Sequence, residues 1–398
     1  MFRRSRILQA IIPALLTTAC ASPQPEALHR NINAVEPAAG SALPSPRAAA
    51  LPDIQAGDSE ASSRPFVGPD GQLDPAIEAF AREVALQRQL PLDHVTTLLR
   101  EARYNATAAR LMSPSKTRIR RSWVTYRGRF VEPIRIRNGE QFWREHADEL
   151  ARAEAIYGVP ASIIVAIIGV ETLYGRHTGD FRVLDALATL GFRYPDPTRP
   201  ERAHMFRNQL ADLITLDHQG LLDARTATGS FAGAMGLPQF MPGSLARFAA
   251  DGDGDGHIDL HGSASDAIVS VARFLRLHGW RPELPVFAPV TPPGNAQQWV
   301  TGGLTPTLKW EELQAGGARL AGTATAMAWQ AHPLGMVDLV DEPRNSVEYR
   351  VGTLNFFALT HYNRSYFYAS SVADLAQELE RRMNAAPSRA QLKTPVER

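Results

Sequence analysis

The segment from Val159 to Val170 carries no charged residue, and Glu171 follows it directly. A helix that is apolar on all sides is buried in a core rather than laid on a surface. A carboxyl group at the end of such a helix loses water, and its pKa rises because burial disfavours the charged form. A carboxylic acid that stays protonated near neutral pH can donate a proton to a leaving group. The pattern therefore predicts that Glu171 is a general acid at the edge of a cleft.

A second interpretation of the same carboxyl group stays open. Buried acids also form structural ion pairs, which perturb a pKa without any catalytic role. Arg176 is the nearest arginine along the chain. On this helix alone, a general acid and a buried ion pair with Arg176 are both compatible with the sequence.

The first 20 residues are typical of an export signal. Arg3, Arg4 and Arg6 precede a mainly apolar stretch from Ile7 to Leu16. This stretch has the length of a signal peptide and is too short to cross a bilayer. We therefore expect residues 1–20 to be a signal peptide of a protein that leaves the cytoplasm.

Cys20 is the only cysteine of the chain and lies at the end of this signal. A single cysteine excludes an internal disulfide framework and a cysteine-rich metal site. The residues before it resemble a bacterial lipoprotein motif, except that Thr17 stands where leucine is usual. We expect a lipid on Cys20 that tethers an otherwise soluble protein to a membrane, and Ala21 in the next position favours the outer membrane. An incidental cysteine is the alternative.

The composition beyond the signal indicates a linker and then a globular chain. Residues 21–65 are rich in Ala, Pro and Ser without periodicity, which predicts a disordered linker. The 398 residues are 44% hydrophobic and 21% charged, an ordinary globular composition. The formal net charge of +1 gives no electrostatic reason to expect a nucleic-acid partner.

Helical periodicity dominates from Asp74 onward. The helix that carries Glu171 is expected to begin at Pro160 and to end at Gly175. Ser122–Ile136 is rich in β-branched and aromatic residues and is predicted to be extended or loop structure. Residues 281–345 are rich in Pro and Gly and predict a small β-rich insertion. Further helices are predicted over residues 77–86, 92–112 (one helix or two), 141–157, 184–190, 201–217, 267–278, 351–357 and 372–383.

Closely spaced glycines and alanines fill the segment from Gly229 to Ser244. Such a segment lets the backbone approach another chain or a ligand closely. Ser230 and Gln239 add neutral donors and acceptors, which orient a sugar or an amide without adding charge. The segment therefore predicts a ligand-binding loop, and a glycine-rich packing loop is the alternative.

Alternating acids and glycines mark another short segment, which matches the first part of an EF-hand calcium loop. Position 12 of that loop is Gly262 rather than the usual glutamate, so the last ligand is expected from a slightly longer loop. We expect a structural calcium ion here, and an acid-lined turn without metal is the alternative. The expected ligands are Asp251, Asp253, Asp255, the backbone carbonyl of His257, and Asp266.

Seven strings in this order resemble the membrane-bound lytic murein transglycosylase B family, and the resemblance covers the chain from about Asp74 to Met383. Several long motifs in register are more specific than any one of them alone. The strings are Arg129–Pro133, Gly169–Thr172, Leu184–Leu190, Ser230–Pro242, Gly254–Ile258, His278–Trp280 and His361–Asn363.

The resemblance implies an α+β, mainly α fold, with a lysozyme-like catalytic core, an N-terminal helical domain and a small β-containing insertion. The expected domains are the helical domain at 66–155 and the catalytic core at 156–398, with the calcium loop at 251–266 and the insertion at about 281–345. Glu171 matches the single catalytic acid and base of the family, and no organic cofactor is expected. Phe274 and Met205 depart from positions where the family can have a tyrosine or another aromatic residue. The substrate contacts of the family match Tyr126, Arg202, Ser230, Gln239, Tyr362, Asn363 and Tyr368.

The activity implied by the resemblance is cleavage of the β-1,4 bond between N-acetylmuramic acid and N-acetylglucosamine in peptidoglycan. Because no second carboxylate belongs to the motif, Glu171 would act first as acid and then as base, leaving a 1,6-anhydromuramoyl end. We expect a periplasmic monomer anchored to the outer membrane, with glycan strands and cell-wall synthesis enzymes as partners. Two alternatives stay open: a hydrolytic muramidase, in which water attacks, and a non-catalytic, calcium-stabilised lipoprotein that binds peptidoglycan.

Overall fold

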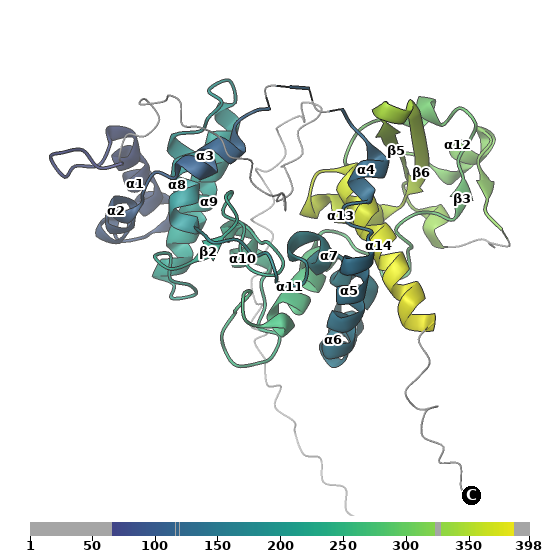
Figure 1. Ribbon diagram of the computed structural model, residues 1–398, viewed down its shortest axis with the longest axis horizontal. Helices are drawn as coiled ribbons and strands as arrows, with labels where there is room; N and C mark the ends of the chain where they lie inside the picture. Colours follow the sequence, from purple (N-terminus) through teal and green to yellow (C-terminus); the bar gives the residue numbers. More distant parts are fainter. Residues whose placement is uncertain (1–65, 116, 119, 323–327, 386–398) are drawn as a thin grey trace, which may run out of the picture. The chain divides into compact units, whose positions relative to one another are not determined.

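The computed structural model describes residues 66–385, apart from Lys116, Ile119 and residues 323–327 (Figure 1). The predicted signal peptide, Cys20 and the linker to residue 65 lie outside the described residues. No single helix in the described ranges is long and apolar enough to cross a membrane. The helices Ala147–Tyr157 and Ala161–Thr172, with a bend of 115° between them, reach that length and apolar composition only when they are taken together.

Helices make up most of the described chain, which confirms the mainly α fold class. The helices are α1 (Pro75–Arg88), α2 (Leu92–Glu101), α3 (Ala106–Met112), α4 (Trp123–Arg127), α5 (Pro133–Glu145), α6 (Ala147–Tyr157), α7 (Ala161–Thr172), α8 (Val183–Phe192), α9 (Pro200–His218), α10 (Pro242–Phe248), α11 (Ala264–Leu277), α12 (Trp310–Ala315), α13 (Leu354–Tyr362) and α14 (Tyr366–Ala385). The strands are β1 (Phe181–Arg182), β2 (Thr228–Gly229), β3 (Val290–Thr291), β4 (Arg319–Leu320), β5 (Gly335–Asp341) and β6 (Ser346–Gly352). They pair antiparallel as β1–β2, β3–β4 and β5–β6.

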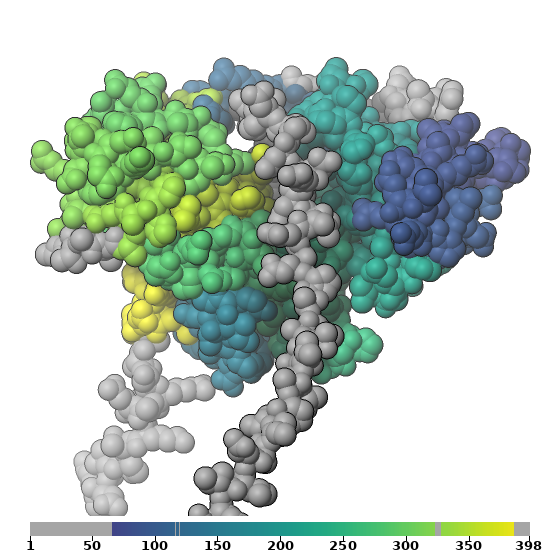
Figure 2. Space-filling view, turned by 180° about the vertical axis from the view of Figure 1, so that it is seen from behind, coloured from purple at the N-terminus to yellow at the C-terminus, as the bar shows by residue number. Residues whose placement is uncertain are grey.

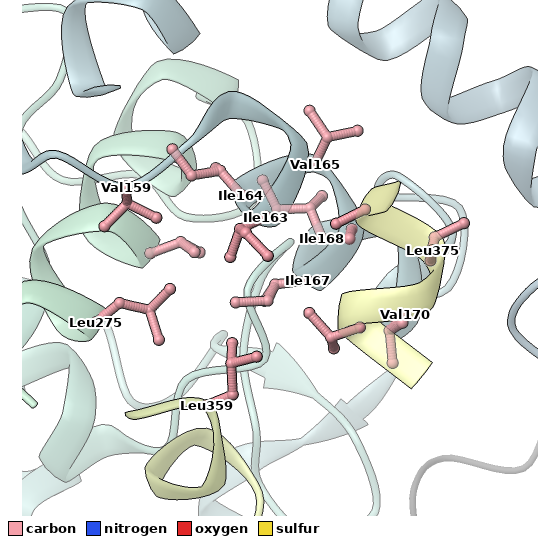
Figure 3. Packing of buried hydrophobic residues seen from close by; sticks show 14 of the residues in the cluster. Val159, Ile163, Ile164, Val165, Ile167, Ile168, Val170, Leu275, Leu359 and Leu375 are labelled. Carbon is pink, nitrogen blue, oxygen red and sulfur yellow. The ribbon is translucent and has the colours of Figure 1, made fainter. Parts of the chain in front are cut away.

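α7 is buried on every side, as its uncharged sequence predicts. Eleven of its twelve residues are buried, and Glu171 is the exception. Its aliphatic side chains lie among Leu275 of α11, Leu359 of α13 and Leu375 of α14 (Figure 3). Full burial of one such side chain contributes about 1.5–3 kcal/mol, so packing fixes this helix strongly. The helix ends at Thr172, three residues before the predicted end at Gly175, and Leu173 after it has a φ of 52°.

Three hydrophobic clusters form the core of the described residues. The first surrounds α7 and takes in residues of α4, α5, α6, α11, α13 and α14. The second unites α1, α2 and α3 with α8 and α9. The third lies within residues 284–351, around Trp310 and Trp329, and the described residues of this range gather in the green area of the space-filling view (Figure 2). The predicted division of the chain into domains at residue 155 stays a prediction.

The prediction of extended or loop structure for Ser122–Ile136 is wrong for most of the segment. The segment contains α4 and the first turn of α5, and only residues 128–132 between them are turns and bends. The Ser122 side chain accepts a hydrogen bond from the Thr125 N–H, and the Glu132 side chain caps α5 in the same way. Capping satisfies N–H groups that have no partner inside a helix, and a proline fits the first helical position. These local signals outweigh the β-branched composition.

Two other helix boundaries also differ from the prediction. The single helix expected over residues 141–157 is two helices, α5 and α6, which meet at His146. The helix expected from Val351 begins only at Leu354, because Val351 belongs to β6 and Thr353 caps α13. Since β6 pairs with β5 along its whole length, the β-rich segment extends to Gly352 rather than to residue 345.

Candidate active site

Glu171 lies in the last turn of α7 with one strong polar partner. The Tyr368 hydroxyl on α14 donates a hydrogen bond to its Oε1 at 2.6 Å, and Tyr368 itself is only 1% exposed. Burial raises the pKa of Glu171 from 4.5 to about 7, while the hydrogen bond from Tyr368 acts to lower it. Arg176 is exposed, and no ion pair reaches Glu171 among the described residues. The geometry thus favours the general acid over the ion pair with Arg176.

Tyr362 and Tyr368 line the site next to this carboxyl group. The Tyr362 hydroxyl at the end of α13 donates to the Pro238 carbonyl at 2.6 Å, and its ring stacks on that of Tyr368 with centroids 6.3 Å apart. Burial raises the pKa of both phenols well above 10, so both are neutral donors near pH 7. Tyr126 of α4 lies beside Phe367, with ring centroids 5.5 Å apart, and so approaches the same end of α14.

The glycine-rich segment is joined to the end of α7. The Thr172 hydroxyl donates to the Leu237 carbonyl at 3.0 Å. The Gln239 backbone has a φ of 51°, and its side-chain nitrogen donates to the carbonyls of Thr178 and Gly236 at 3.1 and 3.0 Å. These bonds use both N–H donors of the amide, so the side-chain oxygen is left to accept from a ligand.

Ser230 and the sharp turn at Gly236 shape the same loop. Ser230 is 9% exposed, and its hydroxyl group accepts from the Ala234 N–H at 3.1 Å. Gly236 has a φ of 68°, and a Cβ there would lie 2.4 Å from the Leu260 carbonyl oxygen. Only glycine tolerates both this conformation and this approach. The loop therefore approaches a neighbouring segment closely, as its composition predicts.

Asn363 and Arg202 are the remaining predicted substrate contacts. Asn363 directly follows Tyr362, and its buried Oδ1 has no hydrogen-bond partner among the described residues. Such an acceptor is costly to bury unless a ligand or water satisfies it. Arg202 instead lies on α9 and donates to the Tyr194 hydroxyl at 3.2 Å. Phe274, buried beside Tyr362 at 4.9 Å between ring centroids, supplies a ring in that wall without a hydroxyl group.

Three carboxylates of the predicted calcium loop converge in space. Asp251, Asp253 and Asp255 are exposed, and their ligand atoms lie within 4.8 Å of one another. Backbone N–H groups of Gly256 and Gly254 lower the pKa of Asp251, so it stays ionised. Several carboxylate oxygens at this spacing fit a hard cation such as Ca²⁺.

Asp266 has a different place from these three acids. It is only 1% exposed and accepts from the backbone N–H groups of Gly252 and Asp259, both at 2.7 Å. These bonds hold the two ends of the acidic loop together. Its role as an additional ion ligand stays a prediction.

Two contacts at the end of α7 were not predicted from the sequence. One is the Thr172 bond to Leu237, although Thr172 belongs to the Gly169–Thr172 string. The other is Arg135 of α5, whose Nε donates to the Gly169 carbonyl at 2.9 Å. Arg135 lies two residues beyond the Arg129–Pro133 string, which is the one sequence signal near it.

A helical core that presents one desolvated carboxyl group, with a pKa raised to about 7, beside tyrosines and neutral amides is typical of a glycan-cleaving enzyme. Residues 72–377 match the transglycosylase SLT domain, and the chain belongs to this family. The membrane-bound lytic murein transglycosylase B of Escherichia coli (strain K12) is 39% identical over 258 residues, 64% of this chain and 67% of the relative. The predicted family and the prediction of an enzyme are thereby confirmed: the chain is a lytic transglycosylase.

Solved structures of lytic transglycosylases support the same fold. The soluble lytic transglycosylase SltB1 of Pseudomonas aeruginosa is 40% identical, with a TM-score of 0.69 over 78% of this chain and 100% of that chain. A lytic transglycosylase of Escherichia coli in complex with calcium is 31% identical, with a TM-score of 0.66 over 81% and 98%. SltB3 of Pseudomonas aeruginosa in complex with NAG-NAM-pentapeptide is 27% identical, with a TM-score of 0.64 over 76% and 78%. The lysozyme-like fold class is confirmed, and the roles of individual residues stay predictions.

Proposed function

We propose that this lytic transglycosylase cleaves the bond between N-acetylmuramic acid and N-acetylglucosamine in peptidoglycan, with Glu171 acting first as acid and then as base. One observation carries the proposal: the Glu171 carboxyl group is desolvated, has a pKa of about 7 and accepts a hydrogen bond from Tyr368. An acid with this pKa is partly protonated and partly ionised near neutral pH, which suits a group that must use both forms. The relatives named for murein or solved with a peptidoglycan fragment support the choice of substrate.

In the first step, protonated Glu171 donates its proton to the glycosidic oxygen, and the bond from C1 of the muramic acid residue to that oxygen breaks. The acetamido group of the substrate stabilises the oxocarbenium-like centre in place of a second protein carboxylate. Glu171 is left ionised. The Tyr368 hydroxyl then stabilises the carboxylate, since hydrogen bonds to charged acceptors are stronger than those to neutral ones.

In the second step, the Glu171 carboxylate takes the proton of the C6 hydroxyl group, whose oxygen attacks C1. The product carries a 1,6-anhydro ring, no water is consumed, and the acid is protonated again for the next cycle. Ser230, Gln239 and Asn363 position the sugars and their acetamido groups, and the tyrosine rings offer apolar faces. Arg202 binds the substrate at a subsite on the side of α9.

The proposal also includes a structural calcium ion and a membrane anchor. The carboxylates of Asp251, Asp253 and Asp255, with the His257 carbonyl and Asp266, would hold the ion and remove the repulsion between like charges. The calcium complex of a relative supports this part. A lipid on Cys20 would anchor the enzyme to the outer membrane from the periplasm, which the name of the membrane-bound relative supports.

Mass spectrometry of the products of purified murein tests the reaction. Wild-type enzyme is expected to release anhydro-ended muropeptides, and Glu171→Gln is expected to release none while retaining its fold and its binding to murein. Reducing ends from the wild type would identify a muramidase instead. Equal activity of Glu171→Gln and of the control Glu283→Gln, which changes an exposed carboxylate, would contradict the catalytic role of Glu171.

A further inference from the structure

The helix that carries Glu171 ends in an unusual backbone conformation. Leu173 and Tyr174 have φ values of 52° and 60°, and Gly175 follows with a φ of 83°. The left-handed region is unfavourable for residues that carry a Cβ. Two such residues in succession persist only where surrounding contacts hold them, and such strain is concentrated at functional sites. The last turn of α7 therefore depends on anchors outside the helix.

Tyr174 is the first anchor and acts by shape. A Cβ on Gly139 of α5 would lie 2.3 Å from its hydroxyl oxygen, and a Cβ on Gly169 of α7 would lie 2.4 Å from it. The two glycines thus form a slot into which the tyrosine ring fits. The Tyr174 hydroxyl is buried without a hydrogen-bond partner in the described part of the chain. Packing, rather than a polar contact, holds this side chain.

Arg135 is the second anchor and acts by hydrogen bonding. Its Nε donates to the Gly169 carbonyl at 2.9 Å, and its Nη1 donates to the Arg129 carbonyl. The same Gly169 oxygen accepts the Leu173 N–H at 3.1 Å, the bond that closes the left-handed turn. The guanidinium group lies over the Phe130 ring, 5.2 Å from its centroid, which fixes its orientation. Arg135 therefore connects α5 to the last turn of α7 through the Gly169 carbonyl, which lies two residues before Glu171.

We propose that Arg135 is a positioning residue for the reaction. By holding the Gly169 carbonyl it fixes the last turn of α7, and with it the place of the Glu171 carboxyl group opposite the Tyr368 hydroxyl. The inference rests on the proposed role of Glu171. That role makes position critical, because one carboxyl group must reach the glycosidic oxygen and then the C6 hydroxyl group. A displacement of about 1 Å can cost about 100-fold in rate.

Loss of this anchor has a consequence for pH dependence as well as for rate. A loosened turn admits water to Glu171, and hydration favours the ionised form of a carboxyl group. The groups that face Glu171 from α14 and α13 are Tyr368 and Tyr362, both of which stay neutral near pH 7. The alkaline limb of the pH profile of kcat/KM therefore reports on Glu171, and we expect it to move downward when the turn is loosened.

Arg135→Met, assayed in the full-length enzyme on soluble murein fragments, tests this inference. The variant keeps the apolar stem and removes the donors; Arg137→Met, at an exposed position of the same helix, is the matched control. We expect kcat to fall about 100-fold in Arg135→Met, with KM within about twofold and the alkaline limb lower by about one pH unit. Arg137→Met is expected to match the wild type.

Arg135→Lys keeps the charge but lacks the planar fork, so about a tenfold fall in kcat is expected. Arg135→Lys tests the positioning role even if Arg135→Met does not fold. A wild-type kcat in Arg135→Lys would overturn the inference. Equal behaviour of Arg135→Met and Arg137→Met, or a fall in activity with an unmoved alkaline limb, would overturn it as well. An inactive Glu171→Gln beside a fully active Arg135→Met refutes only the positioning role, whereas an active Glu171→Gln refutes the proposed function itself.

Discussion

Replacing Glu171 by glutamine is expected to stabilise the folded protein at neutral and alkaline pH. The native carboxyl group has a pKa of about 7 instead of 4.5, chiefly because it is buried. Between these two values the folded protein holds a proton that the unfolded chain has released, so the free energy of unfolding falls as the pH rises through this window. The difference of about 2.5 pH units, at about 1.36 kcal/mol for each, amounts to about 3 kcal/mol. Glutamine has nearly the same shape, is neutral at every pH and can still accept the Tyr368 hydrogen bond.

Urea unfolding of the wild type and of Glu171→Gln at pH 5 and pH 8, at constant calcium concentration, measures this effect. We expect the variant to be more stable by about 3 kcal/mol at pH 8 and by less than about 1 kcal/mol at pH 5. Glu283→Gln, at an exposed position, serves as the control and is expected to show no such dependence. A gain of equal size at both pH values, or no gain at pH 8, would refute the reasoning that desolvation raises the pKa of Glu171.

Two further predictions concern Tyr368 and the calcium loop. Tyr368→Phe removes the hydrogen bond that lowers the pKa of Glu171. Because such a bond is worth about 1.5–3 kcal/mol, the alkaline limb of kcat/KM is expected to move upward from about pH 7 by about one to two pH units, and an unmoved limb in the pH profile would contradict this role of Tyr368. Chelation of calcium is expected to lower the Tm of the wild type and of Asp148→Asn, an exposed control, and to leave that of Asp253→Asn unchanged. A chelator response of Asp253→Asn equal to that of the wild type in differential scanning fluorimetry would argue against the calcium loop.

The helix of Glu171 could be predicted because an uncharged run of that length has no stable place other than a core. The structure of Ser122–Ile136 could not be predicted in the same way. The β propensities of its residues span only about 1 kcal/mol, and the caps provided by Ser122 and Glu132 contribute as much or more. The break between α5 and α6 at His146 could not be predicted for another reason. The two helices continue one apolar pattern, and such a pattern does not show where the helix axis bends.

The acid of the site was accessible from the sequence, but its immediate surroundings were not. Tyr368 follows Glu171 by 197 residues, and only the packing of α14 on α7 brings its hydroxyl group to the carboxyl group. It was expected as a substrate contact, a role that stays a prediction, whereas its hydrogen bond to the acid was not expected. Arg135 was missed because it lies in the segment whose local structure was predicted wrongly. Errors in local structure thus hide the contacts that depend on it.

The enclosure of α7 decides where the strength of the acid can be adjusted. A substitution at any of its eleven buried positions either leaves a cavity or overpacks the core, at a typical cost of about 1–5 kcal/mol. The helix therefore tolerates little change of its own. Tyr368 of α14 contacts the acid, and Arg135 of α5 contacts the Gly169 carbonyl in the last turn of α7, so substitutions in these two helices can change the pKa of the acid while α7 stays as it is. A version suited to a more acidic or more alkaline cell wall is best sought there, with α7 left as it is.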